Sequence, residues 1–126
     1  MTFDPRTIAT PVYEALSDLR SRSPNDATRL KEHKNQAVEL YTYLSTWGML
    51  RLRAEETALG QDGKKEVVQK FFGCLEELSG RESLNLETLK DLDTKAYLGL
   101  TGLGLAIANE FSFWANAVYH DISGGE

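Results

Sequence analysis

Apolar residues recur at spacings of three and four along most of the chain, which is the period of an α-helix with one buried face. No stretch shows the strict alternation of apolar and polar residues that is typical of a half-buried β-strand. The pattern predicts helices over residues 11–22, 27–46, 49–59, 64–78, 86–92 and 93–119. The sequence therefore predicts an all-α fold, a compact bundle of five to six helices in one domain, 1–126, with flexible ends at 1–9 and 121–126.

Residues with special backbone preferences mark the breaks between these helices. Pro11 is expected at the start of the first helix, where its missing N–H costs nothing. Gly48 follows Trp47 and predicts a break or bend, since glycine readily adopts the left-handed conformation that ends helices. The third helix is expected to stop near Gly60, and Ser79 and Gly80 are expected to end the fourth.

The last predicted helix is apolar on two faces, which is typical of a helix surrounded by others. Its larger side chains form one row: Leu100, Leu103, Ile107, Phe111, Trp114 and Val118. Small residues such as Ala108 and Ala115 would let a neighbouring helix approach closely, so we expect this helix to form the centre of the bundle. Gly99, Gly102 and Gly104 weaken its first turns and leave room for another backbone, including one from a partner chain.

Composition narrows the class of protein. A length of 126 residues fits one domain, with 41% hydrophobic and 26% charged residues as in ordinary globular proteins. The single cysteine, Cys74, cannot form an internal disulfide, and no signal-peptide pattern is visible, so we expect a cytoplasmic protein. The segment 96–119 is long enough to span a bilayer, but Glu110 near its middle favours a buried core helix instead.

The net charge of −5 is unevenly distributed. Residues 27–70 carry eight basic and six acidic side chains, whereas 71–126 carry three basic and nine acidic ones. If their helix ends converge, the basic residues of the middle region form a patch that holds phosphates without reading bases. The candidates for contact with an RNA backbone are Arg29, Lys31, Lys34, Arg51, Arg53, Lys64 and Lys65. From composition alone, ordinary solubilising charge explains these residues better.

The residues that usually carry chemistry do not form a recognisable constellation. His33 and His120 belong to no spaced metal motif, and Cys74 lies among large apolar residues. The glycine-rich run 99–104 follows no predicted strand and lacks the lysine of a phosphate-binding loop. We therefore expect a protein with no enzymatic activity, no metal and no cofactor.

Two segments resemble the small helical subunit of type III-B CRISPR effector complexes, the Cmr complexes. The first, 33–53, is similar to that family's helix-glycine-leucine-helix segment and includes Ala37, Leu40, Leu44, Gly48, Leu50 and Arg51. The second, 97–117, begins with Tyr-Leu-Gly-Leu-Thr and looks like the family's last helix. The sequence departs from the family at Gly48-Met49-Leu50-Arg51, where a glutamine often follows a glycine-leucine pair, and at Phe113-Trp114-Ala115, where a basic residue often precedes the alanine.

The resemblance implies a non-catalytic subunit that acts in antiviral defence. Copies of it would stack head to tail, brace the other effector subunits and line the channel that holds guide RNA and target RNA. Three other interpretations stay open. They are the small subunit of another type III or type I effector complex, a generic helical protein–protein adaptor unrelated to nucleic acid, and a small helical enzyme or ligand-binding bundle. The last is disfavoured because the inward-facing carboxylate and histidine pairs of metal-binding bundles are missing.

Overall fold

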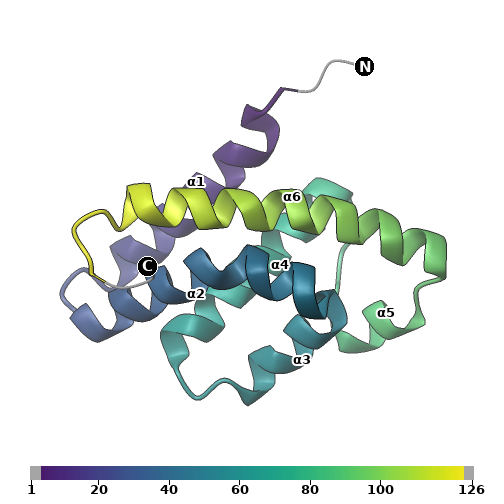
Figure 1. The fold of residues 1–126 in the computed structure, drawn as a ribbon, viewed down its shortest axis with the longest axis horizontal. Coiled ribbons are helices and arrows are strands. Elements are labelled where there is room, and N and C mark those ends of the chain that lie inside the picture. The colour runs from purple at the N-terminus through teal and green to yellow at the C-terminus, as the bar shows by residue number, and fades with distance from the viewer. Residues whose placement is uncertain (1–3, 124–126) are drawn as a thin grey trace.

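The computed structural model describes residues 4–123, and this part of the chain contains six helices and no β-strand. The helices are α1 Arg6–Arg22, α2 Ala27–Trp47, α3 Met49–Ala58, α4 Asp62–Ser79, α5 Leu86–Asp91 and α6 Thr94–Val118. Figure 1 shows them as one bundle in which α6 extends along the whole molecule. The predicted all-α fold around a long C-terminal helix is confirmed.

The first helix begins five residues earlier than the sequence predicted. α1 starts at Arg6, and Pro11 therefore lies inside the helix rather than at its first position. Asp4 stabilises the start, because its carboxylate accepts a hydrogen bond from the Arg6 backbone N–H at 2.9 Å. The extra turn buries Ile8, whose apolar contacts offset the backbone hydrogen bond that proline cannot make.

The predicted flexible ends, 1–9 and 121–126, fall partly outside the described residues, which exclude 1–3 and 124–126. Within the described part, residues 6–9 belong to α1. Beyond α6, the Arg20 guanidinium donates two hydrogen bonds to the Asp121 carboxylate, at 2.6 and 2.7 Å. These hydrogen bonds lower the pKa of Asp121 to about 2. The segment that follows α6 is thus attached to α1.

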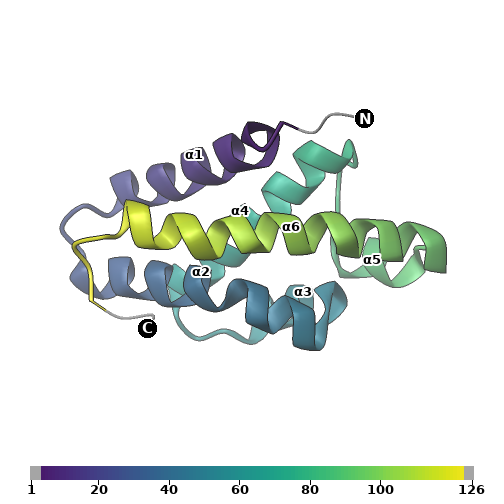
Figure 2. The same ribbon diagram turned by 45° about the horizontal axis from the view of Figure 1, so that its top comes forward.

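α6 is the central helix of the bundle and packs against α1, α2 and α4 (Figure 2). Gly104 allows the close approach to the junction of α2 and α3, because a β-carbon there would lie 3.3 Å from the Met49 sulfur. Gly99 and Gly102 have nothing within 4 Å of such a β-carbon. The sequence predicted close packing at all three glycines, but only Gly104 lies at a close contact within the fold.

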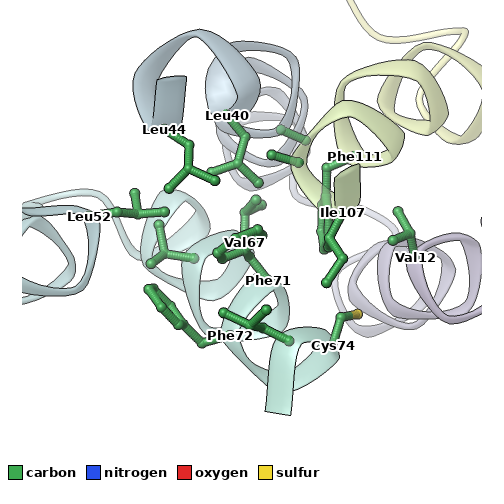
Figure 3. Close-up of a cluster of buried hydrophobic side chains, with 14 of the residues drawn as sticks. Val12, Leu40, Leu44, Leu52, Val67, Phe71, Phe72, Cys74, Ile107 and Phe111 are labelled. Atoms are coloured by element: carbon green, nitrogen blue, oxygen red, sulfur yellow. The ribbon is translucent and has the colours of Figure 1, made fainter. Parts of the chain in front are cut away.

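All six helices contribute side chains to one hydrophobic core, part of which is shown in Figure 3. Phe71 on α4 lies at its centre, with its ring edge-on to Phe72 and to Phe111, at centroid distances of 5.1 and 6.1 Å. Each ring is almost completely buried, so each contributes roughly 2–3 kcal/mol of hydrophobic stabilisation.

None of the six helices combines the length and apolar character that crossing a membrane requires.

Candidate nucleic-acid interface

The three basic residues predicted on α2 point in different directions. Residues on an α-helix are separated by about 100° each, so Arg29, Lys31 and Lys34 cannot share one face. Arg29 points toward α4 and forms an ion pair with Glu66 at 3.1 Å. Lys34 is only 7% exposed, and its ammonium donates to the Ile122 carbonyl at 2.5 Å. Lys31 is exposed. Of these three, only Lys31 is exposed and forms no ion pair within residues 4–123.

The two arginines of α3 also separate. Arg53 is half-buried, where it lies over the Phe72 ring at 4.4 Å and forms an ion pair with Glu56 at 3.1 Å. Arg51 is exposed and lies over the ring of Trp47, with 4.0 Å between its guanidinium carbon and the ring centroid. Residues two positions apart lie on opposite sides of a helix, so the Arg53 side chain packs against the core and the Arg51 side chain lies at the surface.

Lys64 and Lys65 occupy the first turn of α4 and are partly exposed. Within residues 4–123, neither forms an ion pair. The structure therefore does not gather the seven predicted residues into one patch. Arg29, Lys34 and Arg53 are engaged in contacts within the fold, and the cations left available to a phosphate are Lys31, Arg51, Lys64 and Lys65.

The bend between α2 and α3 presents an aromatic side chain that the sequence reasoning did not assign to a site. Gly48 has a φ of 86°, which only glycine adopts readily, and it separates the two helices as predicted. Trp47, immediately before it, is 53% exposed. We call Trp47, Gly48, Leu50 and Arg51 the α2–α3 corner. The sequence signal for it was the large aromatic beside the glycine, a pair that predicted only a break or bend between two helices.

The α2–α3 corner is held in place by α6. The Leu50 backbone N–H donates to the Tyr97 hydroxyl at 3.0 Å, and the Gly48 N–H donates to the Leu44 carbonyl at 2.9 Å. The nearest acidic residue one turn along α3, Glu55, accepts a hydrogen bond from the Tyr43 hydroxyl at 3.1 Å. No carboxylate of residues 4–123 lies within ion-pair distance of Arg51. The corner is therefore a fixed aromatic surface with an arginine that forms no ion pair within the described residues.

A cluster of largely buried polar side chains connects three segments: α2, α4 and the end of α6. His33 is fully buried and hydrogen-bonded on both ring nitrogens, to Glu66 at 2.9 Å and to the Tyr119 hydroxyl at 3.0 Å. Burial raises the pKa of Glu66, but hydrogen bonds from His33 and Arg29 outweigh it and hold that pKa below its ordinary value. Burial also raises the pKa of Tyr119 well above its usual range. Since the Tyr119 hydroxyl beside His33 is itself inaccessible, the group acts as a structural link between helices.

The thiol of Cys74 and the acidic side chains were the remaining candidates for a reactive or metal-binding site. Cys74 is buried against α1, and desolvation raises the pKa of its thiol to about 12, so it stays protonated at neutral pH. In the described part of the chain, no three histidine, cysteine or acidic side chains are close enough together to hold a metal ion.

The exposed side of α6 carries no charge over most of its length. We call it the α6 face, and it consists of Leu98, Gly99, Gly102, Ala106, Asn109, Phe113, Asn116 and Ala117. Leu98 and Phe113 are 63% and 62% exposed, more than any other large apolar side chain of the described residues. Twenty helical residues span roughly 30 Å. A long uncharged surface with protruding apolar groups is typical of a contact with another protein.

No family model matches the chain, and neither a curated protein nor a solved structure shows significant similarity to it. The fold and the sites define the protein as a small helical bundle with two exposed surfaces of different chemistry. One is the aromatic and basic α2–α3 corner, and the other is the uncharged α6 face.

Proposed function

We propose that the protein is a non-catalytic small subunit of a type III CRISPR effector complex, and that it acts in antiviral defence in the cytoplasm. Copies of it stack head to tail, contact the other effector subunits, and hold guide and target RNA through the sugar-phosphate backbone without reading sequence. Base pairing with the guide already selects the target, so the protein needs only charge and shape at this point.

One observation carries the proposal. The segments 33–53 and 97–117, which resemble the small subunit of Cmr complexes, are far apart in sequence but form one structural unit. Tyr97 closes the α2–α3 corner through its hydrogen bond from Leu50, and the Ser112 hydroxyl donates to the Ala37 carbonyl at 3.3 Å. The residues that carry the resemblance therefore contact one another in the fold.

The distribution of charge supports head-to-tail stacking. Six acidic and two basic residues lie between Glu76 and Asp93, at the end of the molecule that contains α5 (Figure 1). Lys64 and Lys65, which form no ion pair within residues 4–123, lie toward the opposite end, where α4 begins. Head-to-tail association needs two different and complementary surfaces, and these two ends meet that requirement.

The uncharged α6 face also suits a second candidate, a helical adaptor that binds one protein and no nucleic acid. Both candidates use this face for a protein contact, so the face does not distinguish between them. The α2–α3 corner does, because an adaptor has no need of an arginine that lies over a tryptophan without an ion-pair partner.

The test is affinity purification of the tagged chain from its native host, with identification of the proteins and RNA that accompany it. We expect several CRISPR effector subunits and a guide RNA. Recovery of a single unrelated protein without RNA would establish the adaptor instead. A Lys31→Glu/Arg51→Glu variant should still enter the complex but capture less target RNA, whereas Arg6→Glu, at an exposed position of α1 outside these surfaces, should behave as wild type.

A further inference from the structure

Trp47 is exposed although its ring would be more stable in an apolar environment. Its side chain is 53% exposed at the last position of α2. The other tryptophan, Trp114, is half-buried beside Tyr13, and its indole N–H donates to Glu110 at 3.2 Å. A solvent-exposed indole forfeits a substantial part of the hydrophobic free energy that burial would supply. An indole held in this way is available to a ligand.

Arg51 completes a flat surface with Trp47. Its guanidinium carbon lies 4.0 Å from the ring centroid, which is a cation–π contact with the planar group over the ring. The guanidinium also contacts the Tyr43 hydroxyl, which donates to Glu55, but no carboxylate of residues 4–123 lies within ion-pair distance of it, so it can still bind an anion beside the ring. A planar aromatic surface next to a cation without an ion-pair partner matches the two parts of a nucleotide, the base and the phosphate.

The two side chains are also pre-positioned. Gly48 ends α2, and the hydrogen bonds at Leu50 and from Leu52 N–H to the Gly48 carbonyl, at 3.0 and 3.2 Å, fix the direction of α3. A ligand that stacks on Trp47 therefore does not have to order the backbone first, which lowers the cost of binding.

We propose that Trp47 and Arg51 form a stacking site for an unpaired nucleotide of single-stranded RNA. The base stacks on the indole and the adjacent phosphate lies against the guanidinium. This inference rests on the proposed function for the choice of RNA, and it extends that function from backbone contact to base stacking. Every base has a π face, so the site holds any unpaired base and rejects bases that are paired inside a duplex.

The surroundings favour a nucleotide over a protein side chain. A tryptophan at the centre of a protein–protein contact is normally ringed by residues that exclude water. Here Ser45 and Thr46 on the same turn are polar and exposed, and Arg51 brings a net positive charge. These features suit a ligand that is itself partly hydrated and carries a phosphate at each step.

The direct test uses the two tryptophans of the full chain as probe and internal control. Isotope-labelled protein is titrated with a short single-stranded oligouridylate, and the two indole N–H signals are followed by NMR. We expect the Trp47 signal to shift and the Trp114 signal to stay. Inorganic polyphosphate should shift the Trp47 signal much less, because it offers charge without a base. Equal shifts with both ligands, or no shift of the Trp47 signal with RNA, would overturn the proposal.

Substitutions can show whether RNA binding depends on stacking at Trp47 or on any exposed aromatic side chain. Trp47→Ala should weaken oligouridylate binding by about fivefold or more, and Trp47→Phe should retain most of the affinity. Tyr41→Ala removes another exposed aromatic of α2, one that has no arginine over it and lies outside both surfaces, and should leave RNA binding unchanged. Loss of a protein partner with Trp47→Ala, at unchanged RNA affinity, would show the corner to be a protein contact and would also overturn the proposal.

The outcome is separable from that of the proposed function. If the chain purifies with CRISPR subunits but Trp47→Ala captures target RNA normally, only the stacking site fails. If no CRISPR subunit accompanies the chain but the Trp47 signal still responds to RNA, the assignment to the effector complex fails and the stacking site stands.

Discussion

Lys31 and Lys34 lie on the same turn of α2, yet their surroundings give them different roles. Lys34 is almost completely covered, and its ammonium is bonded to the Ile122 carbonyl beyond α6. A buried ammonium persists only when such partners replace its lost hydration. Lys31, on the outer side of the helix, keeps its full hydration and is available to a ligand.

Lys34→Ala should lower the free energy of unfolding by about 1–3 kcal/mol, because it removes a buried hydrogen bond and the packing of the aliphatic stem. Lys31→Ala should change it by less than about 0.5 kcal/mol. Urea unfolding of both variants measures the difference. RNA capture by the assembled complex should show the opposite ranking. Per folded molecule, the Lys31→Ala variant should capture less target RNA than the Lys34→Ala variant. Equal stability of the two variants would contradict the internal role of Lys34.

Glu66 gives the stability of the fold a defined pH dependence. The pKa of its carboxyl lies below the ordinary value of 4.5: burial raises it, but hydrogen bonds from His33 and Arg29 lower it by more. A carboxyl with a lowered pKa in the folded state stabilises the fold above its unfolded pKa, and this contribution is lost as the pH falls through the folded pKa.

Glu66→Gln should therefore be less stable than wild type at neutral pH, and the gap should shrink below about pH 4.5. Urea unfolding midpoints across this range provide the measurement. Glu39→Gln, on the exposed side of α2, is the matched control and should follow the wild-type curve. A gap that stays constant as the pH falls would mean that Glu66 acts through packing and not through its charge.

At the scale of elements, the start of α4 is fixed against α2 by a close backbone approach. A β-carbon at Gly63 would lie 2.7 Å from the Glu32 β-carbon and 2.9 Å from the Arg29 carbonyl oxygen, closer than real β-carbons come. The Gly63 N–H also donates to the Glu32 carboxylate at 3.0 Å. Gly73, farther along the same helix, has open space around it.

Gly63→Ala should lower the free energy of unfolding by about 1–3 kcal/mol, since backbone atoms must move to admit the methyl group. Gly73→Ala should raise it by up to about 1 kcal/mol, because alanine is the better helix former and nothing obstructs it. Thermal or urea unfolding of the pair tests both signs. A stabilising Gly63→Ala would mean that the two helices are not packed this closely.

At the scale of the whole molecule, the α6 face leaves the central helix with one open side. α6 packs on α1, α2 and α4, whereas Leu98 and Phe113 on its outer side protrude into solvent. Apolar groups in an uncharged surface of this length are expected to be covered in an assembly.

Phe113→Glu should leave the fold intact, because the side chain is exposed, but should reduce co-purification of partner subunits at least about tenfold by placing a charge in an apolar contact. Tyr41→Glu on α2 is the control, since Tyr41 is also an exposed aromatic but lies outside the α6 face. Circular dichroism checks that both variants are folded. If both variants co-purify with partners equally well, the α6 face is not the assembly surface.

Local patterns in the sequence determined the number and type of the elements. The three-and-four spacing of apolar residues identified all six helices, and Gly48 and Gly80, both at positive φ, ended helices where predicted. The start of α1 was missed, because the gain from burying Ile8 is a tertiary effect that outweighs the usual position of a proline. Helix boundaries therefore followed from the sequence wherever backbone preference decided them.

What only the tertiary structure decided is which charges and apolar groups remain at the surface. Arg29, Lys34 and Arg53 look like Lys31 and Arg51 in the sequence, but partners from distant segments engage the first three: Glu66, the Ile122 carbonyl and the Phe72 ring. Likewise, Trp47 continues an apolar stripe in the sequence and is left exposed only because the chain turns at Gly48. Periodicity is a property of neighbouring residues, whereas pairing and exposure depend on residues that meet only after folding.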